Sequence, residues 1–156
     1  MAPPVDFKLT RPTAGFLHPT VFLKKIEFAD DNERQYVKQL AKRTLSDKNR
    51  IYLLTNEVDT VFGFVALSVS TIQDVPCIVI NYLFCSLPYR NQTFTELNGK
   101  ISVHLIERAI QIAREVNTHV PIHYLALQPA HEKLEAMYAE LDFKSLHHKD
   151  WMVLKI

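Results

Sequence analysis

Tyr138 has a residue type and a position that suit proton transfer. It lies in LALQPAHEKLEAMYAELDF (Leu125–Phe143), a short apolar run that turns at a proline and continues as a helical pattern. A phenol has a pKa of about 10 and joins a polar tip to an apolar ring, so it suits a proton donor at the end of an apolar channel. The same tyrosine shares a helical stripe with Leu134, Met137 and Leu141, so a plain core position is the alternative.

A second stretch with chemical character, LPYRNQTFTELNGKIS, directly precedes a strongly amphipathic segment. A helix that begins near Ile101 would direct its first backbone N–H groups at an anion, and its dipole favours negative charge there. Gly99 permits a close backbone approach, while Lys100 and Arg90 add positive charge. The pattern predicts a pyrophosphate site, with an ordinary helix cap after a long loop as the alternative.

Other chemistries find little support in the spacing of reactive residues. His119 and His123 are separated by Pro121, which breaks the helical geometry that would align them, and neither cysteine forms a paired motif. We therefore expect no metal site. No general base stands out, and the acids near predicted turns are Glu57, Asp59, Asp74 and Glu96.

Length and composition fit one domain with one core. The chain has 156 residues, of which 47% are hydrophobic. We expect an irregular N-terminal arm over residues 1–19, which hold four prolines, and a single domain over residues 20–156.

Charge and hydropathy narrow the partners and the compartment. The formal charge of +1 argues against a surface devoted to nucleic acid, so no nucleic-acid partner is expected. No apolar run reaches the roughly 18 residues of a membrane helix, and the first residues show no signal-peptide pattern. Cys77 and Cys85 are expected to be buried, reduced residues. These features predict a cytoplasmic protein that does not bind a membrane.

The hydrophobic pattern predicts an α/β (α+β) fold with a mixed sheet of six to seven strands and helices on both faces. Strand patterns run over residues 20–28, 50–56, 60–72, 77–87, 122–127, 143–148 and 151–156. Helical patterns run over residues 29–45, 100–116 and 131–141.

Connection lengths predict the order of the strands. Short turns join the strands of residues 50–87, so these should be antiparallel, whereas the helix over 100–116 should make strands 77–87 and 122–127 parallel neighbours. Ligands of open α/β sheets bind where such a connection changes direction, so the Asn98–Ser102 amides and the Tyr138 hydroxyl are expected to share one cleft. The apolar strand 151–156 is either internal or an exposed edge that invites a second copy, and hence a homodimer.

Both quoted stretches resemble the GCN5-related N-acetyltransferase superfamily, over roughly residues 20–156 by element order. INYLFCSLPYRNQ followed by GKISVHLIERAIQIA looks like its fourth strand, its acyl-CoA pyrophosphate loop and the next helix. The C-terminal stretch is similar to a strand–helix pattern in which an Asn is followed seven residues later by Tyr and then by Gly-Phe. Tyr138 and Phe143 match this pattern, and His131 and Asp142 replace its Asn and Gly.

The loop departs from the family pattern Arg/Gln-x-x-Gly-x-Gly/Ala. It has one glycine and is about five residues longer, which indicates a divergent member with an extended pyrophosphate loop. The resemblance implies acetyl-CoA as cosubstrate, a splayed parallel strand pair that holds its pantetheine arm, and Tyr138 as the catalytic donor of a proton to the coenzyme A sulfur. His131 would either hydrogen-bond that arm or cap the last helix. The coenzyme-binding residues implied are Leu83, Phe84, Cys85, Arg90, Asn91, Gln92, Asn98, Gly99, Lys100, Ile101, Ser102 and His131.

Three functions remain open at this point. The first is an acetyl-CoA-dependent N-acetyltransferase that acts on a primary amine of a small molecule or protein. The second, favoured by the loop that lacks glycines, is a catalytically weak acyl-CoA-binding sensor or interaction module. The third is a toxin that acetylates aminoacyl-tRNA, as known in the same superfamily, and the near-neutral charge argues against it.

Overall fold

The computed structural model describes residues 5–129, 132–146 and 150–156. Contacts divide the chain into two units. Unit 1 contains the chain up to Ala66 together with Tyr82–Glu107, and unit 2 contains Leu67–Asn81 and Arg108–Ile156. Each unit is described by itself.

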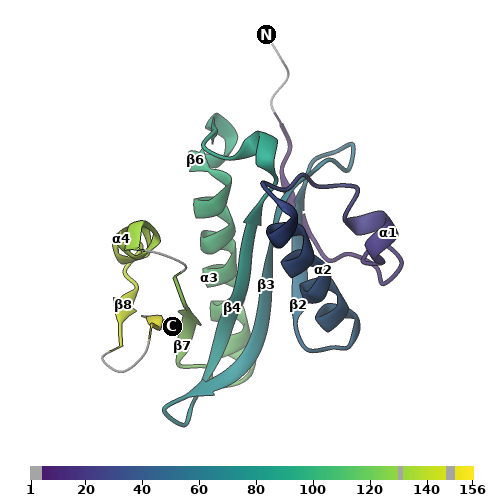
Figure 1. The fold of residues 1–156 in the computed structure, drawn as a ribbon. Helices are drawn as coiled ribbons and strands as arrows, with labels where there is room; N and C mark the ends of the chain where they lie inside the picture. Colours follow the sequence, from purple (N-terminus) through teal and green to yellow (C-terminus); the bar gives the residue numbers. More distant parts are fainter. Residues whose placement is uncertain (1–4, 130–131, 147–149) are drawn as a thin grey trace. The chain divides into compact units, whose positions relative to one another are not determined.

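Among the described residues, a seven-stranded sheet has the strand order β1-β2-β3-β4-β7-β9-β8. Figure 1 labels its strands β2, β3, β4, β7 and β8. Its strands are β1 (Lys8–Thr10), β2 (Arg50–Thr55), β3 (Val61–Ile72), β4 (Val75–Cys85), β7 (Tyr124–Leu127), β8 (Lys144–Ser145) and β9 (Met152–Lys155). A separate small ladder pairs β5 (Thr93–Phe94) with β6 (Gly99–Lys100). The helices are α1 (Pro19–Phe22), α2 (Asp31–Leu45), α3 (Ile101–His119) and α4 (Glu132–Glu140), with 3-10 turns η1 (Leu87–Tyr89) and η2 (Thr95–Leu97).

The predicted mixed sheet is confirmed. β4 and β7 are parallel neighbours, and their register runs from Cys77 opposite Tyr124 to Val79 opposite Ala126. β1 pairs with β2, and β9 with both β7 and β8, in antiparallel fashion. β4 runs on to Cys85, well past this register with β7, as a splayed pair requires. Every residue of β3 from Val61 to Leu67 is buried, which indicates that both faces of that strand are covered.

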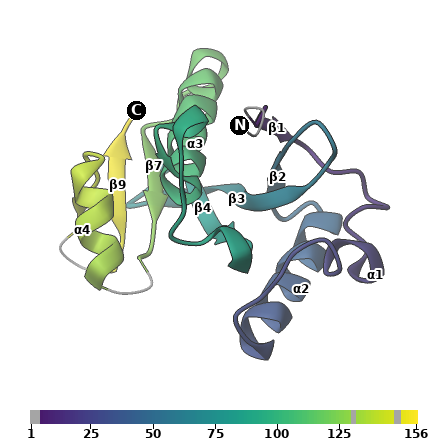
Figure 2. The same cartoon turned by 90° about the horizontal axis from the view of Figure 1, so that it is seen from above.

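The core of unit 1 joins α2 to the sheet. Val37, Leu40 and Ala41 form the buried stripe of α2, which packs in one cluster with residues such as Ile51 on β2 and Phe64 on β3. Figure 2 shows α1 and α2 on the same side of these strands. The Asp30 side chain caps α2 by accepting the Glu33 N–H at 2.8 Å.

The strand predicted over residues 20–28 is wrong. The segment forms α1, followed by turns in which the Lys24 and Lys25 N–H groups donate to carbonyls three residues back. Its β-branched and aromatic residues favoured a strand, but Phe22, Leu23 and Ile26 are buried together. That spacing places them on one side of a helical turn and not on one face of a strand.

The N-terminal arm is not irregular throughout, because Lys8–Thr10 form β1. Leu9 lies opposite Leu54 in the antiparallel register with β2. The prolines suggested an irregular arm, but residues 5–11 contain none, so their N–H groups are available for a ladder.

In unit 2, β7, β9 and β8 form an antiparallel set. β9 lies between β7 and β8, so the strand predicted over 151–156 is internal, and the exposed-edge alternative for it is wrong. A homodimer formed by strand addition would use the edges of the sheet, β1 or β8, instead. Within the described ranges, no helix is long and apolar enough to cross a membrane.

Candidate functional site

The C-terminal end of β4 offers backbone groups along one edge. The Ser86 N–H donates to the Phe62 carbonyl on β3 at 2.8 Å. Because backbone groups alternate along a strand, Leu83 and Cys85 direct their N–H and C=O groups away from β3. The Phe84 side chain is buried in the unit 1 core, with its ring 5.2 Å from that of Phe64. The Leu83 backbone and the Cys85 N–H are therefore placed for pairing with an extended ligand, while the Cys85 C=O accepts the Arg90 Nε–H and Phe84 anchors the strand.

Gly63 on β3 allows β3 and β4 to approach closely at this point. A Cβ on Gly63 would lie 2.3 Å from the Phe84 carbonyl oxygen. No other residue type fits there without movement of backbone, so the path of β4 at Phe84 depends on this glycine.

Arg90 fastens the segment after β4 to α2. Its Nε donates to the Cys85 carbonyl at 2.7 Å, its guanidinium lies 5.3 Å from the centre of the Phe84 ring, and it forms an ion pair with Glu33 of α2. The two charged side chains are only 27% and 19% exposed. The guanidinium predicted to meet pyrophosphate is thus committed to intramolecular contacts. Sequence reasoning missed Glu33, because its place three residues after Asp30 looks like part of a helix cap.

Burial raises the pKa of two groups near the C-terminal end of β4. The pKa of the Cys85 thiol rises to about 11 by desolvation, although the charge of Arg90 opposes this. The pKa of the Tyr82 phenol rises to about 12, first by burial and then by the nearby Glu33 carboxylate. Both groups are neutral near pH 7, so Cys85 is not a thiolate nucleophile.

The loop of residues 86–100 folds back on itself. Thr93 lies opposite Lys100 and Phe94 opposite Gly99 in the β5–β6 ladder, and the Gln92 side chain donates to the Pro88 carbonyl at 2.6 Å. Asn91, Gln92, Asn98 and Lys100 are exposed. The loop thus presents polar side chains to solvent.

The loop runs directly into α3, as predicted. Asn98 has the left-handed φ of 54°, Gly99 has φ 155°, and α3 begins at Ile101, whose side chain is buried. A Cβ on Gly99 would meet no atom within 4 Å, so the backbone conformation rather than packing requires glycine there. The half-buried Ser102 lies in the first turn of α3, where backbone N–H groups have no intrahelical acceptor.

The acids considered as general bases have structural partners or lie on exposed turns. Glu96 accepts the Val5 N–H at 2.8 Å, Glu57 accepts the Asp6 N–H at 3.4 Å, and Asp59 lies 3.8 Å from the Lys8 amine. Asp74 is exposed in the β3–β4 turn. Among the residues the structure describes, no group of three or more His, Cys, Asp or Glu could hold a metal ion.

Tyr138 lies in unit 2, near the end of α4. Its side chain is 6% exposed, its ring lies 5.8 Å from that of Phe143, and burial raises the pKa of its phenol. The hydroxyl has no hydrogen-bond partner among the described residues. Asp142, which stands at the glycine of the strand–helix pattern that the sequence resembles, has the left-handed φ of 73°. His131 lies outside the described residues, and the predicted convergence of Tyr138 with the loop stays a prediction.

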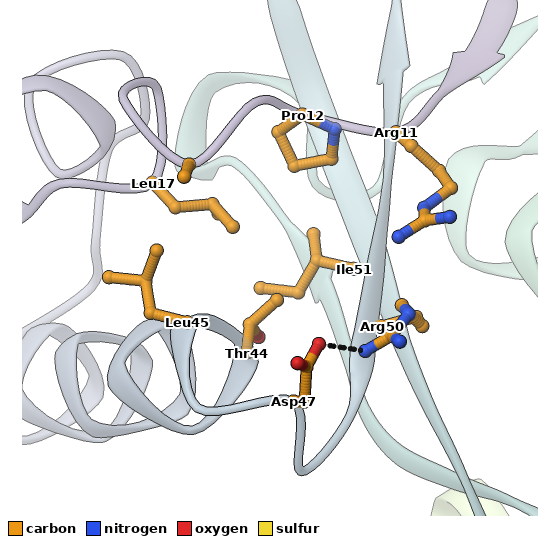
Figure 3. A pocket seen from close by; sticks show the side chains of 9 residues that line it. Arg11, Pro12, Leu17, Thr44, Leu45, Asp47, Arg50 and Ile51 are labelled. Atoms are coloured by element: carbon orange, nitrogen blue, oxygen red, sulfur yellow. Dashed lines mark hydrogen bonds and ion pairs between the residues drawn. The ribbon is translucent and has the colours of Figure 1, made fainter.

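Two of the pockets that the described residues form lie in unit 1. The smaller, of about 180 Å³, lies between the N-terminal arm, the end of α2 and the start of β2 (Figure 3). It has an apolar wall that includes Leu17, Leu45 and Ile51, while Arg11 and the Arg50–Asp47 ion pair lie at its polar side. No residue predicted for the site lines it.

The larger pocket, of about 520 Å³, adjoins the segment that follows β4. The residues that line it are Leu23, Ile26, Glu27, Phe28, Asp30, Asp31, Arg34 and Leu87. Glu27 is fixed to this segment, because its N–H donates to the Ser86 hydroxyl at 2.9 Å and its carbonyl accepts the Leu87 N–H at 3.0 Å. Sequence reasoning missed this pocket, since a strand was expected over residues 20–28.

No family model and no curated protein matches the sequence, but solved structures do. The AtaTR complex with acetyl-CoA matches with a TM-score of 0.79 at 17% identity, over 96% of this chain and 93% of that one. A tyrosine-to-phenylalanine variant of the AtaT toxin, bound to the C-terminus of the antitoxin AtaR and acetyl-CoA, matches with a TM-score of 0.75 at 16% identity. That match covers 96% of this chain and 93% of the other. AtaT complexed with acetyl-methionyl-tRNAfMet matches with a TM-score of 0.73 at 14% identity, over 96% of this chain and 95% of the other.

The chain has their fold. At these identities the likeness is one of fold, and it confirms the GCN5-related N-acetyltransferase architecture predicted from the sequence. Two of these structures hold acetyl-CoA and the third holds acetyl-methionyl-tRNAfMet, whereas no nucleic-acid partner was expected for this chain from its charge.

Proposed function

We propose that the protein is an acetyl-CoA-dependent N-acetyltransferase that acts on a primary amine. The observation that carries the proposal is the course of unit 1 from β4 to α3. The edge of β4 runs past its register with β7, and an ordered loop then leads through Asn98 and Gly99 into the N-terminus of a long helix. The fold shared with acetyl-CoA complexes supports this reading.

In this proposal two segments of unit 1 bind two parts of the coenzyme. The Leu83 N–H and C=O and the Cys85 N–H pair with the pantetheine arm, because these groups point away from β3. The N–H groups around Gly99–Ser102 and the Lys100 amine bind the pyrophosphate. Arg90 holds the end of β4 in place through Cys85 and Glu33 rather than binding phosphate itself.

Acetyl-CoA supplies the acetyl group as a thioester, and the amine acceptor reacts in its neutral form. The amine nitrogen forms the new N–C bond, the C–S bond breaks, and the proton of the amine is lost to water. Tyr138 gives its phenolic proton to the departing sulfur and is reprotonated from solvent. Burial keeps this phenol protonated near pH 7, since it raises the pKa of Tyr138.

The larger pocket is the proposed entry for the acceptor. It adjoins Leu87, just after the β4 edge, and Glu27, Asp30 and Asp31 lie around it with one basic residue, Arg34. An ammonium group is attracted to such a rim before it loses its proton. Asp31→Asn should therefore raise KM for a cationic amine and leave KM for acetyl-CoA unchanged.

The aminoacyl group of a charged tRNA is a second candidate acceptor. The tRNA complex of one neighbour favours it, and so does a group of basic residues near the smaller pocket. Arg11 and Arg50 line this pocket, and Lys42, Arg43 and Lys48 are exposed in the segment that ends α2. Phosphate contacts of this kind would weaken steeply as salt is raised.

The decisive experiment has two steps. A thermal shift at saturating acetyl-CoA tests binding, and an unchanged melting temperature would refute the proposed function. Thiol release with a panel of polyamines, peptides with free N-termini and aminoacyl-tRNA then identifies the acceptor. Coenzyme binding with no thiol release on any acceptor would favour the acyl-CoA sensor instead.

The role of Tyr138 is tested separately. Tyr138→Phe removes only the hydroxyl, so kcat should fall by about 100-fold while coenzyme binding stays intact. Equal activity in this variant would make Tyr138 a core residue.

A further inference from the structure

The segment Val5–Thr10 is attached to the loop of residues 86–100. The Phe7 ring lies 4.9 Å from the Phe62 ring and 5.3 Å from the Phe94 ring. Phe62 also lies 4.7 Å from Tyr89 and 6.2 Å from Phe94. We call these four residues the aromatic cluster. Its members come from the N-terminal segment, β3, η1 and β5, so it joins three parts of the chain that are distant in sequence.

A hydrogen bond strengthens this attachment from the side of the loop. Glu96 of η2 accepts the Val5 N–H at 2.8 Å. Two residues after Phe7 the chain is held again, because Leu9 pairs with Leu54 in the β1–β2 ladder. The segment is thus fixed to β2 at one end and to the loop at the other.

The loop has little secondary structure of its own. Its elements, η1, β5, η2 and β6, have two or three residues each, and a ladder as short as β5–β6 is not stable in isolation. Most of its side chains are exposed, whereas Tyr89 and Phe94 are half-buried in the aromatic cluster. Phe62 is 5% exposed and belongs to the long strand β3, so it gives these rings a fixed base.

We propose that Val5–Thr10 is a strap that holds the loop of residues 86–100 in the conformation that receives acetyl-CoA, with Phe7 as its positioning residue. The part of this proposal that concerns the coenzyme rests on the proposed function, whereas the order of the loop does not. Phe7 contacts the loop through Phe94 and is not expected to touch the reacting groups.

Hydrogen exchange measured by mass spectrometry tests the strap without any ligand. Phe7→Ala removes two ring contacts, so amides of residues 89–100 should exchange about tenfold faster, while those of α2 keep their rates. Phe7→Leu, which retains apolar bulk, should restore most of the protection. Glu96→Ala tests the strap from the side of the loop and leaves all four rings in place.

Phe16→Ala is the matched control. Phe16 lies in the same N-terminal part of the chain and is half-buried, but its ring packs 6.0 Å from Phe22 of α1. Its loss should leave exchange in residues 89–100 unchanged. If Phe7→Ala and Glu96→Ala speed loop exchange no more than Phe16→Ala does, the strap is refuted.

Calorimetry and steady-state kinetics then test the consequence for the coenzyme. Phe7→Ala should raise Kd and KM for acetyl-CoA by about tenfold, because in this variant the coenzyme must first order the loop. At saturating coenzyme the loop is already ordered, so kcat should be nearly unchanged. Faster loop exchange with unchanged acetyl-CoA affinity would overturn the role in coenzyme binding. If the unaltered protein does not bind acetyl-CoA, the proposed function fails, and the exchange data alone decide whether the strap exists.

Discussion

The contact between Arg90 and Glu33 gives the sharpest energetic prediction. Removing one partner of a fully buried ion pair costs about 3–5 kcal/mol, whereas an exposed pair contributes about 0.2–1 kcal/mol. Because these side chains are 27% and 19% exposed, Glu33→Gln should cost about 1.5 kcal/mol of unfolding free energy. Gln keeps a carbonyl oxygen for the Ala29 N–H, which Glu33 accepts at 3.2 Å, so the substitution isolates the charge.

Arg90→Met should cost more than Glu33→Gln. It retains an apolar stem over Phe84 but loses the ion pair and the charged hydrogen bond to the Cys85 carbonyl, for a total of about 3 kcal/mol. In the double variant the ion-pair contribution is lost only once. The double-mutant cycle should therefore give a coupling energy of about 1–1.5 kcal/mol.

Urea unfolding of the four proteins at pH 7 measures this coupling, and Asp47–Arg50 provides the control pair. Those side chains are 83% and 43% exposed, so Asp47→Asn with Arg50→Met should give a coupling of about 0.3 kcal/mol that vanishes in 1 M salt. The Arg90–Glu33 coupling should largely persist in salt. Equal couplings for the two pairs would refute the view that Arg90 locks the end of β4 to α2.

Three further predictions concern backbone and pH. Gly63→Ala should lower the unfolding free energy by about 2–3 kcal/mol, because the new Cβ would lie 2.3 Å from the Phe84 carbonyl oxygen. Gly15→Ala is the control, because a Cβ there meets no atom within 4 Å, and it should change the unfolding free energy by under about 0.5 kcal/mol. Urea titration of both variants measures the difference. Asp142→Gly should be neutral or stabilising and Asp142→Ala should cost about 1 kcal/mol, since φ there is 73°; equal melting temperatures would contradict the dependence on φ. The Cys85 pKa of about 11 lies above its ordinary 9.0, so the thiol stabilises the fold fully below pH 9 and this contribution is lost as the pH rises toward 11. After allowance for partial exposure, this contribution of the thiol to the unfolding free energy is about 1 kcal/mol. Cys85→Ala should therefore make the unfolding free energy fall less steeply between about pH 9 and 11. An unchanged slope would mean that other groups cause the decline.

The sequence predicted those elements whose pattern and spacing agree. The parallel pair β4–β7 followed from one long amphipathic helix between two apolar runs, and α3 begins at the residue where the stripe does. Prediction failed for α1 and β1, where local composition and tertiary context disagree. Val21 and Phe22 favour a strand, but burial of Phe22 beside Ile26 requires a turn of helix, and β1 exists only because β2 offers it an edge.

The sequence predicted the parts of the candidate site that follow from the order of helices and strands. It did not predict the contacts between side chains that are distant in sequence. The place of the loop between β4 and α3 follows from element order, which residue patterns reveal. Glu33, which forms the ion pair with Arg90, lies far away in sequence on α2, and no local pattern indicates such a contact. The same holds for Phe7, whose neighbours Phe62 and Phe94 lie on other elements.

Residues other than glycine adopt left-handed backbone in the loop and after α4. Glycine is favoured where φ is positive, and Asn and Asp are the other residues that adopt this region at modest cost. Here Asn91 has φ 66°, Asn98 has φ 54°, and Asp142, which stands at the glycine of the strand–helix pattern that the sequence resembles, has φ 73°. A sequence pattern written in glycines does not match Asn or Asp, although both residue types adopt this region of φ here. This explains in physical terms how a chain can keep a fold that is shared at 14–17% identity while its motif becomes unrecognisable residue by residue.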